Sequence, residues 1–152
     1  VSAVDIDDDK LSLAHEVGAT YTINSLTEDL HARLQARTQG MGPTVVIEAV
    51  GSPLTYQTAI TEVAFTGRVV YIGYAKSDVS FTTKYFVQKE LDIRGSRNAM
   101  PEDFRAVIRY LNRNTCPIER LISKVIAPEE AHNALQQWAE EPGKVFRILI
   151  KF

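Results

Sequence analysis

Short apolar segments alternate with amphipathic helical segments along most of this sequence. The clearest apolar segment, 44–50, is a run rich in β-branched residues, which predicts a strand buried on both faces. Ser52 and Pro53 follow it directly, in the order expected of an N-cap and the first residue of a helix. Because strands that alternate with helices are joined by crossovers, the pattern predicts an α/β fold with a mostly parallel, doubly wound sheet.

The other elements follow from the same two periodicities. Acidic residues from Asp7 onward suit the first turn of a helix, and Gly18 is placed to end it. No repeat, low-complexity tract or linker interrupts the pattern, so we expect a single domain over 1–152. We expect strands at 1–6, 21–23, 44–50, 67–74, 91–95, 121–126 and 145–152, and helices at 7–17, 27–38, 53–64, 82–89, 101–112 and 128–140.

The composition excludes several classes of protein. The chain has 152 residues, 45% hydrophobic and 24% charged, which rules out disorder. Seventeen basic against nineteen acidic side chains leave no basic excess for a nucleic-acid partner, and no apolar run has the ~18 residues of a membrane span. The single cysteine, Cys116, cannot form an internal disulfide, so we expect a reducing compartment and a cytoplasmic protein.

Candidate ligand-binding residues stand just after the predicted strands, because ligands of open parallel sheets bind outside the carboxyl ends of the strands. They are Asp5 and the turns 49–52, 72–74 and 95–98. Three of these four positions contain glycine, which lets a backbone approach a flat ligand but also serves any tight turn. We interpret three glycines at one edge of a sheet as favouring a ligand.

Asp5 stands where a doubly wound fold places a carboxylate on the ribose hydroxyls of an adenine dinucleotide. The glycine-rich motif GxGxxG, which precedes such an acid by ~20 residues, does not occur in the chain. Counting back from Asp5 leads to a point before Val1, and the chain begins inside a predicted strand. We therefore expect the C-terminal part of a longer polypeptide.

These segments, in this order, resemble medium-chain zinc-type alcohol and polyol dehydrogenases. Segments 4–10 with 15–19, 46–51 and 67–73 are similar to successive parts of that family's cofactor domain, and 142–145 with 148–150 resemble its closing strand. Segment 93–98, with 101–104, is most similar to oxidoreductases of the L-galactonate, L-idonate and sorbitol type. The resemblance implies a Rossmann-like sheet without its first strand and glycine-rich turn. About 1–115 would form that incomplete core, and about 116–152 a segment belonging to the absent catalytic domain.

The resemblance also implies roles for individual residues. Asp5 would hold both ribose hydroxyls, and Lys10 would lie over the same edge of the ribose. Arg97 and Asn98 would point towards the substrate cleft. The other cofactor-binding residues implied are Ala49, Val50 and Gly51 near the adenosine and nicotinamide ribose, Ile72, Gly73, Tyr74 and Ser96 near the nicotinamide carboxamide, and Arg147 at the pyrophosphate.

NAD is expected rather than NADP, because Asp5 and its acidic neighbours would repel a 2′-phosphate. We interpret the acidic run 7–9 as complementing the helix dipole rather than as a metal site. His15, His31 and His132 stand on three predicted helices without further ligands at metal spacing, so neither a metal nor a catalytic residue is expected in this chain. In the parent enzyme, the absent catalytic domain would hold the zinc. The arginines at 105, 109 and 113 fit a solvated helix face.

The function implied is the NAD-binding portion of a zinc-dependent dehydrogenase that transfers hydride between a polyol, sugar acid or other secondary alcohol and a nicotinamide cofactor. This chain alone is expected to be inactive. A non-catalytic nucleotide-binding or assembly module remains an alternative. An S-adenosylmethionine-dependent methyltransferase fragment is another, although the turn 50–53 lacks the acidic or aromatic residues expected there. The strand 91–94 is predicted to lie at a sheet edge and to pair with its copy in a homodimer or tetramer.

Overall fold

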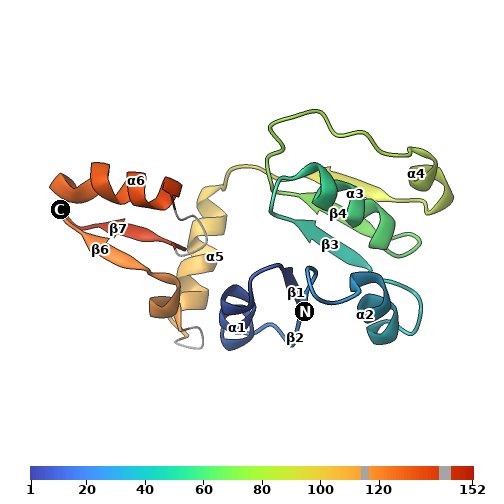
Figure 1. Ribbon diagram of the computed structural model, residues 1–152, viewed down its shortest axis with the longest axis horizontal. Coiled ribbons are helices and arrows are strands. Elements are labelled where there is room, and N and C mark those ends of the chain that lie inside the picture. The colour runs from blue at the N-terminus through green and yellow to red at the C-terminus, as the bar shows by residue number, and fades with distance from the viewer. Residues whose placement is uncertain (114–116, 141–144) are drawn as a thin grey trace. The chain divides into compact units, whose positions relative to one another are not determined.

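The computed structural model describes residues 1–113, 117–140 and 145–152, so Cys116 and most of segment 142–145 lie outside the described residues. The chain divides into two compact units, Val1–Thr27 with Pro101–Phe152, and Glu28–Met100. All strand pairs are parallel, which confirms the α/β class (Figure 1). The strands form three ladders, β1-β2, β3-β4-β5 and β6-β7.

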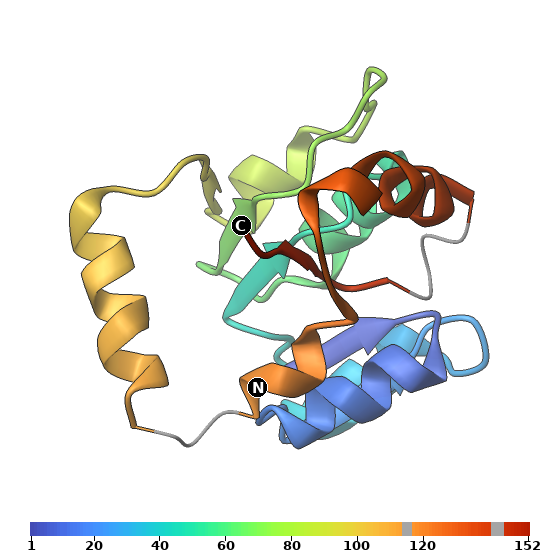
Figure 2. The same ribbon diagram turned by 90° about the vertical axis from the view of Figure 1, so that its left-hand side faces the viewer.

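The first unit begins with β1 (Ser2–Asp5), α1 (Asp8–Glu16) and β2 (Tyr21–Asn24). Asp5 stands beside Asn24 at the ends of the two parallel strands, and α1 lies against them (Figure 2). The helix starts where the sequence predicts, because the Asp7 side chain caps it by accepting hydrogen bonds from the backbone N–H groups of Asp9 and Lys10. Leu11 and Leu13 of this helix and Ile23 of β2 are buried.

The same unit contains α5 (Pro101–Leu111), the 3₁₀ turns η1 (Ile118–Leu121) and η2 (Pro128–Glu130), β6 (Lys124–Ile126), α6 (Ala131–Glu140) and β7 (Ile148–Ile150). The strands predicted at 121–126 and 145–152 are therefore shorter than expected. The first is shortened because η1 takes its beginning, and β7 pairs with β6 over three residues only. Ile126 and Ala134 are buried between this ladder and α6.

The second unit contains α2 (Leu30–Arg37), β3 (Val45–Glu48), α3 (Pro53–Glu62), β4 (Arg68–Tyr71), α4 (Lys84–Gln88) and β5 (Asp92–Gly95). Helix α3 crosses one face of the three-stranded sheet (Figure 1). Ala59 and Ile60 of that helix and Val63, its C-cap, pack on Val69 of the central strand, and these four residues form the core. Strand β5 lies at the edge of this sheet, as predicted.

The expectation that 44–50 is buried on both faces is wrong. Val45 and Ile47 are 51% and 61% exposed, whereas Glu48 on the alternate face is buried and Val46 packs against the core. Two features explain the difference: β3 is an edge strand of its ladder, and α3 covers one face of the sheet. A β-branched run therefore predicted the strand correctly but overestimated its burial.

Helix α2 also begins later than the predicted 27–38. Its N-cap is Asp29, whose carboxylate accepts a hydrogen bond from the Ala32 N–H at 3.0 Å. The sequence suggested the earlier start because Leu26, Leu30 and Leu34 follow one another at fourfold spacing. Leu34 is buried, whereas Leu26, before the cap, is exposed. The stronger N-cap therefore decided where the helix starts.

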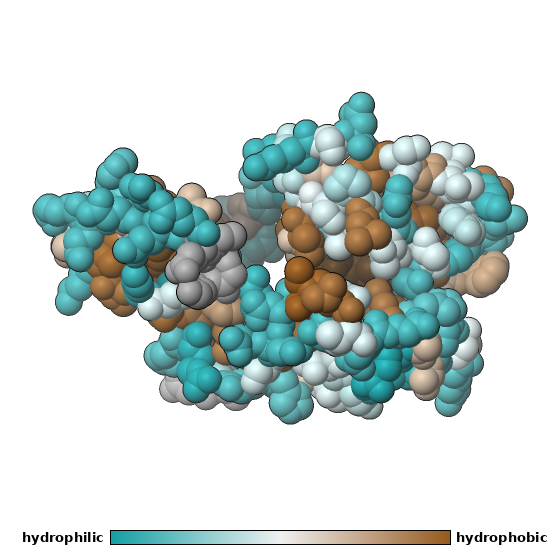
Figure 3. Space-filling model, in the orientation of Figure 1, coloured by the Kyte–Doolittle hydropathy of each residue, from teal (hydrophilic) through white to brown (hydrophobic). Residues whose placement is uncertain are grey.

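None of the described helices combines the length and the apolar character needed to cross a bilayer. Apolar surface is nevertheless visible among the polar side chains, as the brown patches in Figure 3 show. Exposed apolar residues occur at the strand edges, Val4 in β1 and Ile47 in β3 among them.

Candidate functional site

The turns that come after β3 and β4 are in direct backbone contact. The N–H groups of Ile72 and Gly73 both donate to the Glu48 carbonyl oxygen, at 2.8 and 3.0 Å. A Cβ built on Gly73 would overlap the Gly51 nitrogen, and one built on Gly51 would lie 2.6 Å from the Tyr74 nitrogen. Gly51 also has a φ of +80°, which other residues rarely adopt. These two glycines are required by the mutual packing of the turns, so they do not by themselves indicate a ligand.

Gly95, after β5, differs from them. A Cβ built on it would meet nothing within 4 Å. Ser96 next to it donates its N–H to the Tyr71 carbonyl oxygen at 2.9 Å, which brings the turn after β5 to the end of β4. Of the three glycines at this edge, Gly95 is therefore the one with open space beside it for another molecule.

Glu48, the last residue of β3, is a buried carboxylate that is only 4% exposed. Its Oε1 accepts hydrogen bonds from the Val50 N–H at 2.9 Å, the Gly51 N–H at 2.8 Å and the Thr55 hydroxyl at 2.7 Å. Its Oε2 is buried, and no donor reaches it within the described residues. Sequence reasoning gave Glu48 no role. The available signal was a single charge in the apolar run 44–50.

Helix α3 is joined to the same cluster through its first turn. Ser52 and Thr55 form a capping box, in which each side chain accepts a hydrogen bond from the other's backbone N–H, at 3.2 and 3.3 Å. Thr55 thus caps the helix and donates to Glu48 with the same hydroxyl group. The predicted N-cap at Ser52 is confirmed, and the turn between β3 and α3 is held at both ends.

Two tyrosines fix the turn after β4 to the same helix. The Tyr56 hydroxyl donates to the Gly73 carbonyl oxygen at 2.7 Å, and the Tyr71 hydroxyl donates to the Tyr56 carbonyl oxygen at 3.0 Å. Their rings stack with centroids 4.1 Å apart. Burial, followed by the neighbouring Tyr56 and the charge of Glu48, raises the pKa of Tyr71 to about 12.

Several predicted site residues of this unit lie at the surface of these turns. Val50, Ile72 and Tyr74 are exposed, and the Arg97 guanidinium carbon lies 5.9 Å from the centre of the Tyr74 ring. Asn98 has a φ of +65°, in the left-handed region that asparagine tolerates better than most residues. The structure thus brings the turns 49–51 and 72–74 together and places Arg97 over Tyr74.

The other predicted site residues belong to the first unit. Asp5 Oδ1 accepts hydrogen bonds from the N–H groups of Ile6 at 2.8 Å and Asp7 at 3.1 Å. Within the described ranges, Oδ2 has no partner, so one carboxylate oxygen remains as a hydrogen-bond acceptor. Lys10 is half-buried in the first turn of α1. Arg147 is exposed just before β7, where its Nη1 donates to the Phe146 carbonyl oxygen.

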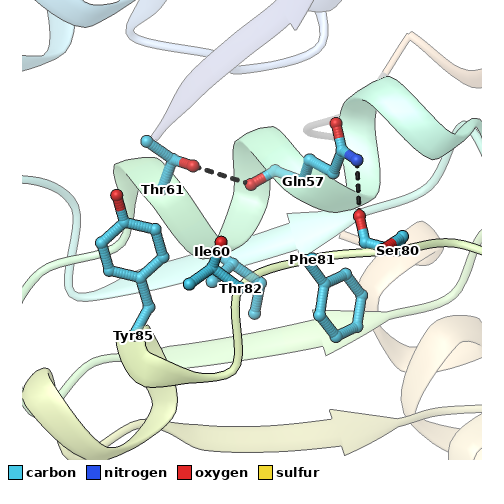
Figure 4. Close-up of a pocket in the computed structure, with 7 residues that line it drawn as sticks. All are labelled: Gln57, Ile60, Thr61, Ser80, Phe81, Thr82 and Tyr85. Atoms are coloured by element: carbon cyan, nitrogen blue, oxygen red, sulfur yellow. Dashed lines mark hydrogen bonds between the residues drawn. The ribbon is translucent and has the colours of Figure 1, made fainter.

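A hollow of about 410 Å³ lies between α3 and segment 80–85, away from these predicted residues (Figure 4). The Gln57 amide crosses from the helix to donate to the Ser80 carbonyl oxygen at 2.6 Å. Its lining is mostly hydroxyl, amide and apolar groups, and Tyr85 is the one titratable side chain among them. It therefore offers no acid–base or metal chemistry of its own near neutral pH.

The part of the chain that the structure describes contains no group of three His, Cys, Asp or Glu side chains that could hold a metal ion. His15 Nδ1 lies 2.9 Å from the Ala19 carbonyl oxygen, His31 Nδ1 lies 2.8 Å from Glu62 Oε2, and His132 is exposed. The acidic run 7–9 supplies the N-cap and first turn of α1, as interpreted from the sequence.

A model of the zinc-binding dehydrogenase family matches residues 1–113. The chain belongs to this family. The sorbitol dehydrogenase of Halalkalibacterium halodurans is 24% identical over 99% of the chain and 43% of its own length. The L-galactonate-5-dehydrogenase of Escherichia coli K12 is 36% identical over 55% of the chain and 25% of its own length.

Solved structures of dehydrogenases also match the fold. The short chain alcohol dehydrogenase RspB of Escherichia coli CFT073, in complex with NADH, has a TM-score of 0.86 and 26% identity. The match covers the whole chain and 44% of the RspB chain. The chain thus spans less than half the length of each of these dehydrogenases. The resemblance found in the sequence and the parallel α/β class are both confirmed.

Proposed function

We propose that the chain is the NAD-binding portion of a zinc-dependent dehydrogenase that transfers hydride between a polyol, sugar acid or other secondary alcohol and a nicotinamide cofactor. Membership in the zinc-binding dehydrogenase family supports the reaction class. The names of two relatives, a sorbitol and an L-galactonate dehydrogenase, support the substrate class. The observation that carries the proposal is the carboxylate of Asp5 at the end of β1, with one oxygen fixed and the other unpaired within the described residues.

Asp5 is suited to a ribose diol in its chemistry as well as its place. Oδ1 is used by the turn, which fixes the carboxylate, while Oδ2 remains an acceptor for a hydroxyl donor. The N-cap and first turn of α1 add Asp7, Asp8 and Asp9 nearby. This concentration of negative charge disfavours a 2′-phosphate, so NAD is the proposed cofactor over NADP. Lys10 would lie along the same ribose.

In the second unit, the strand-end turns are the proposed cofactor contacts. Val50 and Ile72 offer exposed apolar surface, and the space beside Gly95 leaves room for a flat ring. The remaining proposed cofactor contacts are Ala49, Gly51, Gly73, Tyr74 and Ser96 in this unit and Arg147 in the other. Arg97 and Asn98 are proposed to face the substrate.

NAD, when bound, supplies the nicotinamide carbon that accepts or returns the hydride. No zinc ligand set is proposed in this chain, because the described residues contain no suitable cluster. We therefore propose that the chain alone does not catalyse the reaction, since the described residues form no metal site that could polarise the reacting oxygen. A non-catalytic nucleotide-binding module would use the same edge of the sheet. The dehydrogenase is favoured over it, and over a methyltransferase, by the family match.

Association through β5 remains a prediction. The strand occupies the expected edge, but Asp92 already pairs within the chain, with Arg68 at 2.7 Å and Arg94 at 3.0 Å. Both arginines hold the pKa of Asp92 below its usual value. The arginine of an antiparallel copy along 91–94 would therefore meet an Asp92 that already has two arginine partners in its own chain. A homodimer or tetramer and a cytoplasmic location stay proposals.

The direct test is cofactor binding by the 152-residue chain and its Asp5→Ala variant, measured by calorimetry. NAD should bind more tightly than NADP. Loss of a charge-assisted hydrogen bond should raise the NAD dissociation constant by about ten- to a hundredfold and bring the two cofactors closer in affinity. Asp78→Ala is the matched control, because Asp78 is an exposed acid that belongs neither to α1 nor to the proposed cofactor contacts. An unchanged ratio of the two affinities in Asp5→Ala would mean that Asp5 only shapes the turn.

A further inference from the structure

Glu48 joins the two strand-end turns through different parts of the same residue. Its side chain receives the N–H groups of Val50 and Gly51, in the turn after β3. Its backbone carbonyl oxygen receives the N–H groups of Ile72 and Gly73, in the turn after β4. One residue thus holds four amides from two turns that the chain places more than twenty positions apart.

The chemistry of the side chain shows that this arrangement is specific. A carboxylate is costly to bury, and an apolar residue of similar size would satisfy the core equally well. The three donors converge on Oε1, and hydrogen bonds to a charged acceptor are roughly twice as strong as neutral ones. Oε2 remains buried with no donor within the described residues, close to where a Cβ on Gly73 would be. The clearest effect of burying this partly satisfied charge is therefore that it fixes the conformation of the turn after β3.

We propose that Glu48 is a positioning residue for the dinucleotide. Its carboxylate sets the conformation of the turn 49–51 and so the place of Val50, which stands exposed at the carboxyl edge of the sheet. The inference rests on the proposed NAD-binding function and adds to it a residue that need not touch the cofactor.

Glutamine is the informative replacement because it keeps the size and removes the charge. An amide oxygen in place of Oε1 accepts weaker hydrogen bonds from the same donors. The amide NH₂ would then take the place of Oε2, where the described residues offer no partner. Glu62→Gln is the matched control: the Glu62 side chain is 11% exposed, belongs to α3 and pairs with His31, but does not contact the turns.

The first measurement is hydrogen exchange of the backbone amides of the full chain by NMR. In Glu48→Gln, the protection of the Val50 and Gly51 amides should fall by about tenfold, because their acceptor is weakened. The amides of Ile72 and Gly73 should keep their protection, since they donate to the backbone carbonyl oxygen of residue 48. A general loss of stability would lower all four together. Unchanged or uniformly lowered protection would overturn the proposal.

The second measurement is NADH binding, monitored by the fluorescence of the reduced nicotinamide. The dissociation constant should rise by about tenfold in Glu48→Gln, which corresponds to about 1.4 kcal/mol, and stay unchanged in Glu62→Gln. Selective loss of amide protection with unchanged NADH affinity would overturn the positioning role. If the unaltered chain bound no NADH, the proposed function would fail and the cofactor role of Glu48 with it. The exchange pattern would still decide whether Glu48 holds the turn.

A second pair of variants covers the case in which Glu48→Gln does not fold. Thr55→Val removes the hydroxyl donor to Oε1, whereas Thr55→Ser retains it. NADH affinity should fall in the valine variant and recover in the serine variant. Equal affinity in both would overturn the proposal, because a carboxylate held by three donors should respond to the loss of one.

Discussion

Asp5 and Glu48 occupy equivalent places in two different units, each an acid at the carboxyl end of a parallel strand. Asp5 is half-buried, and the turn uses only one of its oxygens. Glu48 is buried, and three donors converge on one of its oxygens. The comparison separates an acid with an acceptor oxygen left over by its turn from one whose hydrogen bonds fix the turn that follows it.

The difference comes from the turn that leads out of each strand. After Asp5, the chain leads into α1 through Asp7, and Asp7 is the residue that caps the helix. Asp5 accepts hydrogen bonds only from the turn before the cap. After Glu48, the chain passes through Val50 and Gly51 under the turn at Gly73, and α3 is anchored to the same carboxylate by Thr55. The two helices thus begin differently: α1 is capped by an acid that follows the strand, whereas α3 is hydrogen-bonded to the acid that ends the strand.

The largest expected effect distinguishes the two acids by stability. Glu48→Ala leaves two backbone N–H groups and a hydroxyl without their buried acceptor, so the free energy of unfolding should fall by about 3 kcal/mol. Asp5→Ala removes a partly exposed turn acceptor and should cost about 1 kcal/mol. Urea titration monitored by circular dichroism measures both. Equal losses would show that the hydrogen bonds of Glu48 stabilise the fold no more than those of Asp5.

The next effect tests the contact between the turns in the Glu48 unit. Gly73→Ala would push a methyl group against the Gly51 nitrogen and to 2.5 Å from Glu48 Oε2, so the backbone must shift. We expect a loss of about 2 kcal/mol from this overpacking. Gly95→Ala, at the open end of β5, should change stability by less than about 0.5 kcal/mol.

The same urea titration measures both glycine variants. A tolerated methyl group at position 73 would contradict the close approach of the two turns. A large loss at position 95 would contradict the open space beside β5.

The smallest effect concerns the charge of Glu48 as felt by Tyr71. One of the six tyrosines should ionise near pH 12 in the ultraviolet absorbance, and that step should vanish in Tyr71→Phe. Because the folded pKa lies above the ordinary value of 10.0, the stabilisation is complete below pH 10 and is lost as the pH rises towards 12. Glu48→Gln should lower the pKa of Tyr71 slightly, since that charge is the least of its three causes. An unchanged pKa of Tyr71 in this variant would show that the Glu48 carboxylate lies too far from the Tyr71 hydroxyl to affect it.

Much of the fold could be predicted from local patterns, since caps and periodicity are local. Asp7, Ser52 and Pro53 marked helix starts correctly, and Asp29 overrode the leucine spacing that suggested an earlier one. Burial was harder to predict, because a β-branched run cannot show which face of its sheet a helix covers. Val45 and Ile47 are exposed on the face opposite to that of Val46 and Glu48, which is the buried one.

The candidate site divides in the same way. Asp5 could be placed at the end of its strand, because the short apolar segment before it and the acidic start of the next helix are both local patterns. Glu48 could not be assigned, because its role depends on a contact between turns separated by all of α3. The glycines at 51 and 73 were noticed, but a packing requirement and a ligand requirement select the same residue.

The hydrogen bonds by which Glu48 holds the turns after β3 and β4 have a consequence for the thermodynamics of ligand binding. Both turns are held by hydrogen bonds to one residue, and two tyrosines tie the second turn to α3. A ligand that settles on this edge therefore has few backbone torsions left to order, and the conformational entropy lost on association is small. Favourable contacts with the proposed cofactor would then appear almost undiminished as affinity, even for a small fragment such as nicotinamide mononucleotide.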